Sequence, residues 1–456
     1  MKRIVPILLR AFYFLITSLV VIAPALYNRY PLMYFDSGAY MEMAVNLEPS
    51  FHRAFGYPLL IKWTGWMVSN WPLILLQGIV LTYLLYKLLQ AVLKRPDVKW
   101  EHLLSVLLLS FASAMPWYAS QLMPDVWSLI LVLSLGLVLI SERISIARGI
   151  GYGLVLTAAL LTHLSHIPLL LLILMTVFAV GWIGKWERFH FSKAQWVTAT
   201  LPLVTAFMLT CSFNAAHGLG FRLSLASNAF ITANLGEMGI LKFYLDEQCE
   251  DLETNLCEIK DHLPRETYGY LWDPEGPVQQ HPKGWAGANA EYAPIVHDFL
   301  TQPRYVKWLI FASVKATVKQ MFQIEIGSGL QYAYGEGTPP YWPMKSHFKQ
   351  ELNEYLTSVQ NKGDALPLDF FRWINYLSLF LSIGMITWAV LKRQLSTELA
   401  ILLIVFLSAY LFNAAITGVL ANVYERLQVR LLPTVQLLAL LMAIRWSGFR
   451  AATSKP

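Results

Sequence analysis

Long apolar runs separated by short polar segments fill most of this chain. A helix that crosses the hydrocarbon core of a bilayer needs about 20 apolar residues. The pattern therefore predicts an all-α polytopic membrane protein with about ten transmembrane helices. The runs cover residues 8–27, 72–93, 103–121, 125–141, 149–163, 166–183, 196–215, 373–391, 399–418 and 430–446.

One long segment, residues 216–372, breaks this pattern. It holds Gly/Pro turns, an acidic run near 246–261 and a polar helical stretch near 345–362. It is too long and too mixed to be a connector, so we expect a small, mostly helical extracytoplasmic domain. It separates an N-terminal transmembrane module, residues 1–215, from a C-terminal one, residues 373–456.

Within that segment, Val306 to Phe322 is apolar but is interrupted by Lys307, Lys315 and Lys319. A spanning helix here would leave Lys392 and Arg393 on the outside. We therefore expect an amphipathic helix that lies on the outer membrane surface.

The composition supports a membrane protein. Of the 456 residues, 56% are apolar and 14% are charged, and the mean hydropathy is +0.47. Soluble domains carry about 25% charged residues, so a soluble enzyme is excluded, as are disordered chains. The net charge of +6 does not indicate nucleic-acid binding, because Lys and Arg in membrane proteins mainly set orientation.

The basic residues divide by side when both termini are cytoplasmic. Short outer loops then hold only Arg29, Arg53, Lys62, Arg426 and Arg430. The inner segments hold sixteen: Lys2, Arg3, Arg10, Lys94, Arg95, Lys99, Arg143, Arg148, Lys185, Arg188, Lys193, Lys392, Arg393, Arg445, Arg450 and Lys455. This excess follows the positive-inside rule. Ala23-Pro24-Ala25 resembles a signal cleavage site, but we favour an uncleaved anchor.

We expect different states for the three cysteines. Cys211 lies in an apolar run and is expected to be buried. Cys249 and Cys257 lie close together in the segment assigned to the outside. An oxidising compartment favours a disulfide between them, with two free thiols as the alternative.

Charged and imidazole side chains that adjoin the apolar runs collect at the predicted outer face. Such groups are functional candidates, because charge is unfavourable at the edge of the hydrocarbon. Arginine binds phosphate oxygens through a rigid fork, and a carboxylate can remove a proton from a hydroxyl. The set therefore suggests transfer from a lipid phosphate. Its members are Asp36, His52, Arg53, Asp125, His163, His166, Glu425, Arg426 and Arg430.

Several of these residues also have structural interpretations. Asp125 follows a proline and could cap a helix. His163 and His166 could cap neighbouring helix ends, and Arg426 and Arg430 could bind lipid headgroups. The sequence contains no nucleotide-binding loop or hydrolase motif, so a lipid is favoured as the activated donor.

In their order and in the membrane face that they share, these residues resemble the GT-C superfamily of multi-spanning glycosyltransferases, which includes protein O-mannosyltransferases and lipid A aminoarabinose transferases. The matching segments are FDSGAYMEMAV at Asp36, HRAFGYPLL at Arg53, MPDVWSL at Asp125 and YERLQVRLLP at Arg426 and Arg430. The resemblance implies a polyprenyl-phosphate-linked sugar donor, an acceptor that is a lipid, glycan or protein, and a catalytic first outer loop at residues 28–70. It also implies a bacterial inner (plasma) membrane, with the site facing the periplasm.

The resemblance also implies roles for individual residues. Asp36 becomes the catalytic base, assisted by Asp125. The donor phosphate is then bound by Arg53, Arg426, Arg430, His163 and His166. Glu42, His52 and Tyr57 are expected to contact the substrate.

Cofactor use stays open. Many relatives carry two adjacent carboxylates in the first loop, whereas Ser37 follows Asp36 here, which weakens the case for a metal. Imidazole suits zinc, so a divalent metal held by Asp36, Asp125, His163 and His166 remains an alternative.

Two other classes of function compete with a transferase. A transporter or lipid flippase would need broken or polar helices near the membrane centre and internal repeats, and the sequence shows neither. An assembly subunit would depend on residues 240–300 more than on Asp36 or Arg430.

Overall fold

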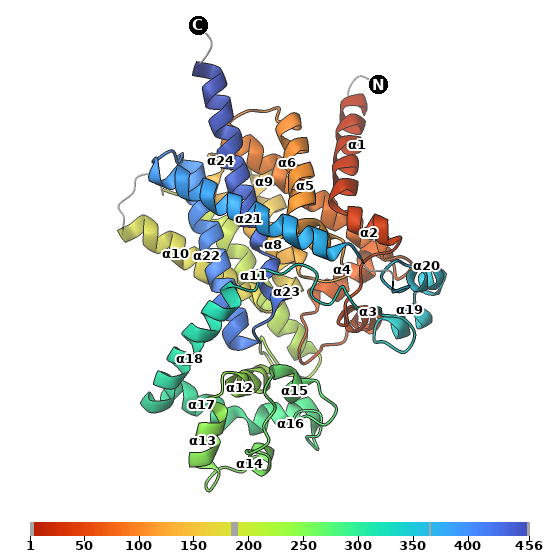
Figure 1. Ribbon diagram of the computed structural model, residues 1–456, viewed down its shortest axis with the longest axis vertical. Coiled ribbons are helices and arrows are strands. Elements are labelled where there is room, and N and C mark those ends of the chain that lie inside the picture. The colour runs from red at the N-terminus through yellow and green to blue at the C-terminus, as the bar shows by residue number, and fades with distance from the viewer. Residues whose placement is uncertain (1–3, 184–189, 364–365, 454–456) are drawn as a thin grey trace.

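The computed structural model describes residues 4–183, 190–363 and 366–453, and every regular element in these ranges is a helix. Figure 1 shows a bundle of long helices with a group of short helices at one end, and both chain termini at the other. The predicted inner residues Lys2, Arg3, Lys185, Arg188 and Lys455 lie outside the described ranges.

Six helices in the described ranges are long and apolar enough to cross a membrane, which agrees with a membrane protein. They are α5 (Trp71–Leu93), α10 (His166–Ile183), α11 (Lys193–Ala216), α21 (Leu368–Leu391), α22 (Thr397–Leu420) and the run Glu425–Ser447, which comprises α23 (Glu425–Val429) and most of α24 (Leu432–Thr453). Shorter apolar stretches lie in α1 (Ile4–Val21), α8 (Val126–Ile140) and α9 (Ile146–Thr162). The total of about ten spans stays a prediction.

The run predicted at 103–121 is not one helix. The structure has α6 (Lys99–Ala112) and then α7 (Met115–Ala119), with extended backbone at Ser113 between them. Pro116 explains the break, because proline is suited to the first turn of a helix and not to its interior. The first run also ends early, since α2 (Ala23–Asn28) is a separate helix with Pro24 in its first turn.

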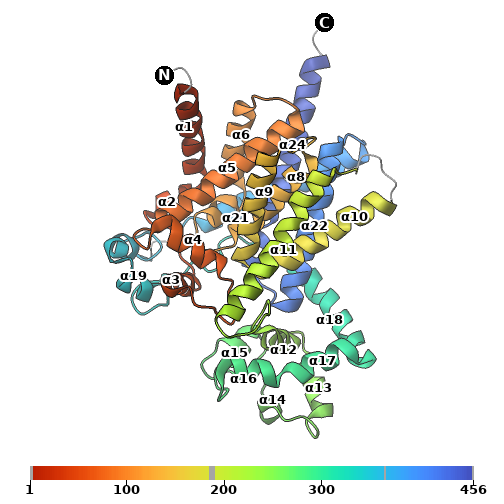
Figure 2. The ribbon, with the colours of Figure 1, turned by 180° about the vertical axis from the view of Figure 1, so that it is seen from behind.

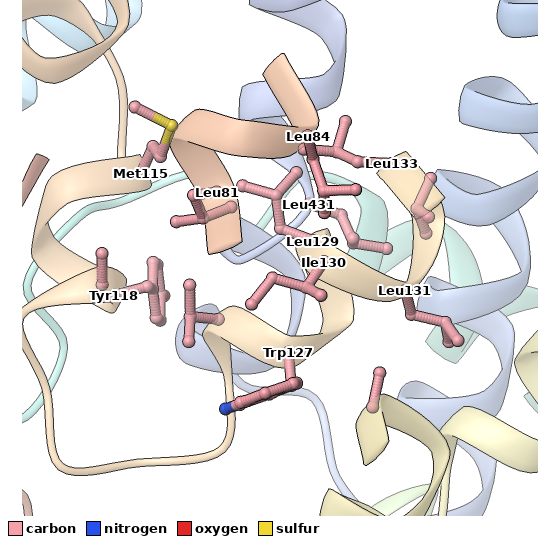
Figure 3. Packing of buried hydrophobic residues seen from close by; sticks show 14 of the residues in the cluster. Leu81, Leu84, Met115, Tyr118, Trp127, Leu129, Ile130, Leu131, Leu133 and Leu431 are labelled. Carbon is pink, nitrogen blue, oxygen red and sulfur yellow. The ribbon is translucent and has the colours of Figure 1, made fainter. Parts of the chain in front are cut away.

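Helix α8 is the centre of the bundle, because all of its residues are buried. It packs against α5, α9 and α22. Figure 3 shows Leu129, Ile130 and Leu133 of α8 among Leu81 and Leu84 of α5. Side chains in such a core are closely packed and move little, so a residue at the end of α8 is held firmly.

The segment between the membrane modules divides between two hydrophobic cores. Residues 227–301 form a helical domain with a core of its own, which includes Tyr244, Tyr270, Tyr292 and Phe299. We call it the α12–α17 domain, and Figure 2 shows it below the bundle. Its helices are α12 (Ser227–Glu237), α13 (Leu241–Gln248), α14 (Asn255–Glu258), α15 (Thr267–Leu271), α16 (Gly284–Glu291) and α17 (Ala293–Thr301).

Residues after this domain return to the main core. Helix α18 (Pro303–Met321) occupies the region predicted to be amphipathic, and its buried residues Ala312, Ala316 and Gln320 form the face that packs on α22. Three short elements then follow, and Met344 and Tyr355 join the main core. They are α19 (Tyr341–Ser346), η2 (Lys349–Glu351) and α20 (Leu352–Leu356).

The predicted disulfide is confirmed. Cys249 and Cys257 are joined, with their Cα atoms 5.6 Å apart. Cys211 is a buried free cysteine in α11, as expected.

Candidate functional site

Two aspartates precede helices but do not cap them. Asp36 precedes α3 (Ser37–Asn46), and Asp125 precedes α8. Neither side chain makes a capping hydrogen bond. Both carboxylates instead pair with arginines from distant segments, so for Asp125 the helix-cap interpretation is wrong.

Asp36 is held between two guanidinium groups. Arg53 Nη2 donates to Asp36 Oδ1 at 2.8 Å, and Arg426 Nη2 donates to Oδ2 at 3.2 Å. Burial alone would raise the pKa of this carboxyl, but Arg53 and Arg426 outweigh burial and hold the pKa below its usual value of 3.8. Asp36 is therefore an anion over the physiological pH range.

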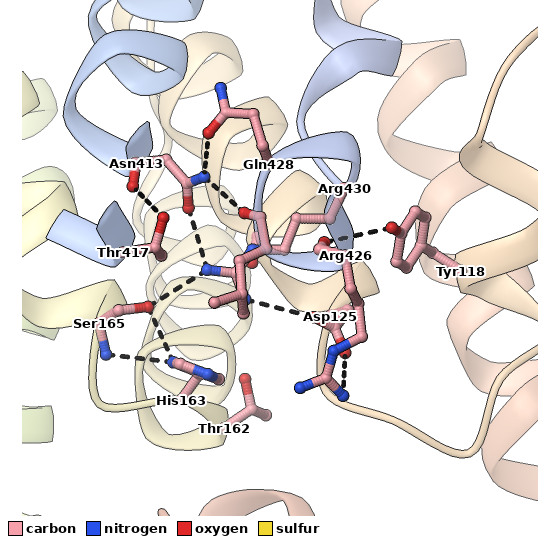
Figure 4. A network of polar contacts seen from close by, with 12 residues as sticks. Tyr118, Asp125, Thr162, His163, Ser165, Asn413, Thr417, Arg426, Gln428 and Arg430 are labelled. Carbon is pink, nitrogen blue, oxygen red and sulfur yellow. Dashed lines mark hydrogen bonds and ion pairs between the residues drawn. The ribbon is translucent and has the colours of Figure 1, made fainter. Parts of the chain in front are cut away.

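A deeper pair lies behind Asp36. Arg430 Nη1 lies 3.4 Å from Asp125 Oδ1, and Arg426 Nη1 lies 3.7 Å from Asp125 Oδ2. Arg430 also donates to Asn413 Oδ1 at 3.0 Å and to Ser165 Oγ at 3.4 Å (Figure 4). We call Asp36, Arg53, Asp125, Arg426 and Arg430 the charged cluster.

Exposure of the side chains falls with depth in the charged cluster. Asp36 is 21% exposed, Arg426 13% and Arg53 10%, whereas Asp125 is 2% and Arg430 0% exposed. Solvent therefore reaches Asp36, Arg53 and Arg426. Asp125 and Arg430 lie behind them.

The charged cluster retains unused hydrogen-bonding capacity. Arg53 Nε, Arg426 Nε and Nη1, and Arg430 Nε are buried and have no hydrogen-bond partner among the described residues. Buried donors are nearly always satisfied in folded proteins. The N–H groups of three arginines, like the acceptor Asp125 Oδ2, are therefore free to form further hydrogen bonds.

Backbone contacts fix the two aspartate-bearing segments to each other. Leu32 N donates to Ser120 O at 2.9 Å, and Leu122 N donates to Leu32 O at 2.9 Å. This short parallel bridge pairs Leu32 with Gln121 and lies four residues before each aspartate.

Two glycines allow the close packing that orients the Asp36 and Arg53 segments. A Cβ atom on Gly38 would lie 2.3 Å from Pro339 O, and one on Gly56 would lie 2.4 Å from Leu161 O. Gly56 begins α4 (Gly56–Gly65), three residues after Arg53. Any larger residue would force these segments away from their neighbours.

The two histidines of the THLSH turn form ordinary polar contacts. His166 Nδ1 lies 2.7 Å from Ala159 O in the last turn of α9, and its Nε2 lies 2.7 Å from Ser128 Oγ. His163 Nδ1 lies 2.8 Å from Ser165 Oγ, which contacts Arg430. His166 thus fits the helix-capping interpretation, and His163 reaches the charged cluster through Ser165.

No group of three or more His, Cys, Asp or Glu side chains is placed to hold a metal within the described ranges. The four ligands considered from the sequence are divided instead. Asp36 and Asp125 pair with arginines, and the two histidines contact serine and backbone oxygens. These residues do not fit a divalent metal.

The three residues expected to contact substrate have separate surroundings. Glu42 is exposed on α3 and takes no part in the hydrogen bonds and ion pairs of the charged cluster. Tyr57 is buried and donates to Gln77 Oε1 at 3.1 Å. His52 lies beside Arg53, against Trp272 and Trp285.

An apolar recess adjoins Arg53. It contains about 280 Å³ of empty volume, which includes space open to solvent. Its lining includes Phe51, Leu164, Phe213 and Leu225 as well as Arg53. The recess lies at the Ala216 end of α11, one turn beyond the exposed residues Met208 and Leu209.

No protein-family model, curated protein or solved structure matches this chain. The function therefore has to be argued from the geometry of the charged cluster and its surroundings.

Sequence reasoning missed several members of the site. Asn413 is a lone amide in the apolar helix α22, which is a signal that could have been used. Tyr34 lies under Arg426, with the Cζ atom 4.2 Å from the ring centre, and Tyr118 donates to Arg426 O at 3.1 Å. Trp272 carries no signal in the sequence, because only the fold brings it to Arg53.

Proposed function

We propose that this protein is a membrane glycosyltransferase of the GT-C type. It transfers a sugar from a polyprenyl-phosphate donor to a hydroxyl group of a lipid, glycan or protein. One observation carries the proposal: the Asp36 carboxylate lies between Arg53 and Arg426 at the accessible edge of an otherwise buried charged cluster.

The charge balance favours an anionic substrate. Three arginines face two aspartates, and the nearby His52 is neutral, because burial and Arg53 lower its pKa to about 3. The cluster thus keeps an excess of positive charge, and arginine forks match phosphate oxygens.

The proposed reaction is a displacement at the anomeric carbon of the donor. The acceptor hydroxyl oxygen forms a bond to that carbon as its proton passes to Asp36. The bond between the anomeric carbon and the phosphate oxygen breaks, and its electron pair stays on the phosphate. Arg53 and Arg426 stabilise the charge that develops on this leaving group.

Asp36 suits the role of base better than Asp125, because a substrate can reach it. A carboxylate paired with two arginines is a weak base in the free protein. When the donor phosphate takes over the guanidinium groups, its negative charge replaces those attractions and raises the proton affinity of Asp36. Donor binding would thereby activate the base. Asp125 keeps Arg426 and Arg430 in place.

The surroundings of the cluster support a lipid donor. The recess beside Arg53 is lined in part by the apolar residues Phe51 and Phe213, and it lies close to the exposed apolar surface of α11, where the chain of a lipid donor would lie. With about ten spans and cytoplasmic termini, the cluster and the α12–α17 domain would face the outside, which in a bacterium is the periplasmic side of the inner membrane.

The decisive experiment uses the full chain in vesicles that contain a polyprenyl-phosphate-linked hexose or pentose. Mass spectrometry then follows two products, free polyprenyl phosphate and the glycosylated acceptor. We expect the wild type to form both and the Asp36→Asn variant to form neither. Transport of the donor across the vesicle membrane without either product would instead favour a flippase.

A further inference from the structure

The segment that carries Arg53 has no regular secondary structure. It connects α3 to α4, and residues 47–55 contain only bends and loop. A loop of this kind normally leaves a long side chain free to move. Something outside the segment must therefore hold Arg53 within hydrogen-bonding distance of Asp36.

Two aromatic contacts hold the segment, one on each side of Arg53. Phe55 stacks on Phe213 of α11, with ring centres 4.3 Å apart and planes 14° from parallel. On the other side, the His52 ring lies 4.7 Å from Trp272 and 5.2 Å from Trp285. The first anchor belongs to a long bundle helix, and the second belongs to the α12–α17 domain.

The His52 contact is part of a continuous row of rings. Trp285 of α16 stacks on Phe230 of α12 at 5.8 Å, and Trp272 and Trp285 lie 5.0 Å from each other. Phe230 packs directly on the core of the domain. The row therefore joins the domain core to the residue next to Arg53.

The row also contacts Arg53 itself. The Cζ atom lies 6.0 Å from the ring centre of Trp272 and 5.2 Å from that of Tyr40. Cations favour such positions over electron-rich ring faces, most strongly over tryptophan. The guanidinium group thus lies between an indole from the α12–α17 domain and a tyrosine from α3.

We propose that Trp272 and Trp285 are positioning residues through which the α12–α17 domain sets the placement of Arg53 in the anion site. Both indoles contact the His52 ring, and Trp272 also lies 6.0 Å from Arg53 Cζ. The guanidinium group is thereby directed at Asp36 and at the phosphate that replaces it. The domain is then part of the donor site. This inference rests on the proposed function only in that Arg53 binds the substrate phosphate.

The test measures binding of farnesyl phosphate to the detergent-solubilised full chain by calorimetry. Binding of this probe needs no sugar, acceptor or turnover. A phosphate held by a well-placed arginine loses about tenfold in affinity when a contact worth about 1.4 kcal/mol is removed. We therefore expect the Trp272→Ala/Trp285→Ala variant to bind farnesyl phosphate about tenfold more weakly.

A double-mutant cycle separates positioning from general damage. In an Arg53→Ala background, the same two tryptophan substitutions should change the affinity less than about twofold, because the group that they position is gone. Equal losses in both backgrounds, or no loss in either, would overturn the inference. The single variant His52→Phe keeps a ring against the two indoles and should bind within about threefold of the wild type, whereas His52→Ala should resemble the double variant.

Trp308→Ala is the matched control. It removes an indole that packs on the core of the same domain, through Tyr305 and Phe243, and it should leave the affinity unchanged. The alternative is that the two tryptophans bind the sugar directly. Their loss would then weaken the binding of a sugar-bearing donor but not of farnesyl phosphate, and this result would refute the positioning role. Failure of the wild type to transfer sugar would refute the proposed function alone, since the binding cycle is read without turnover.

Discussion

The replacement of Asp36 by asparagine should have opposite effects on binding and on turnover. The carboxylate both accepts the proton in the proposed reaction and occupies the guanidinium groups that the phosphate needs. Asparagine has nearly the same shape but lacks the charge. The variant should therefore lose transfer while it binds farnesyl phosphate more tightly than the wild type.

The structure gives the size of the binding effect. Asp36 accepts hydrogen bonds from Arg53 at 2.8 Å and from Arg426 at 3.2 Å. Hydrogen bonds to charged groups contribute about 1.5 to 3 kcal/mol each. The phosphate must replace both, and the asparagine carbonyl can retain one. At about 1.4 kcal/mol per factor of ten, affinity should rise at least about tenfold.

The effect on turnover follows from the proton. A general base contributes roughly 10² to 10⁴ in rate, so transfer should fall by at least that range. Calorimetry measures the affinity for farnesyl phosphate, and mass spectrometry of free polyprenyl phosphate measures the rate of transfer. Glu48→Gln is the control, because this exposed carboxylate lies in the same region of the chain and its loss should change neither.

Two results would refute this reasoning. Transfer retained within about tenfold would show that Asp36 is not the base. Weaker binding of farnesyl phosphate by a folded variant would show that Asp36 supports the anion site and does not compete for it.

Three further predictions concern stability, each measured by thermal unfolding in detergent. Arg430→Met removes the nearer of the two arginines beside the buried Asp125 and leaves only Arg426, at 3.7 Å. This change should lower stability by about 3 kcal/mol, and a second change, Asp125→Asn, should recover part of the loss. An undiminished single variant would argue against a buried pair. Gly56→Ala places a methyl group against Leu161 O and should cost about 1 to 3 kcal/mol, whereas Gly65→Ala, which has open space, should be neutral. The pKa of His52 is lowered to about 3 in the folded protein and lies near 6.5 when the chain unfolds, so the unfolded state takes up the proton first as the pH falls. The wild type should therefore lose about 2 kcal/mol of stability between pH 7 and pH 5, and His52→Phe should not show this loss. An equal loss in both proteins would contradict the burial of a neutral ring.

The sequence predicted the helical class because apolar runs of about 20 residues have few alternatives to a membrane helix. It predicted the meeting of Asp36, Arg53 and Arg426 because each lies in a short loop predicted on the same side of the membrane, and runs that alternate in direction bring such loops together. It was wrong about a single helix at 103–121, because hydropathy does not register the turn that Pro116 imposes.

Other features depend on lateral packing, which a hydropathy pattern does not contain. The sequence could not show that Tyr57 uses its hydroxyl on Gln77 inside the bundle. It likewise could not place Trp272 against His52, more than 200 residues earlier in the chain. Ring contacts of this kind are visible only once the fold is known.

The backbone bridge between Leu32 and Gln121 has a consequence for how such a protein can change during evolution. It ties the start of the first loop to the segment that leads into α8, a helix whose residues are all buried. Substitutions on exposed parts of the α12–α17 domain, away from Trp272 and Trp285, can then accumulate while the spacing of the two aspartates stays constant. The relative position of the two carboxylates is thereby insulated from sequence drift elsewhere in the chain.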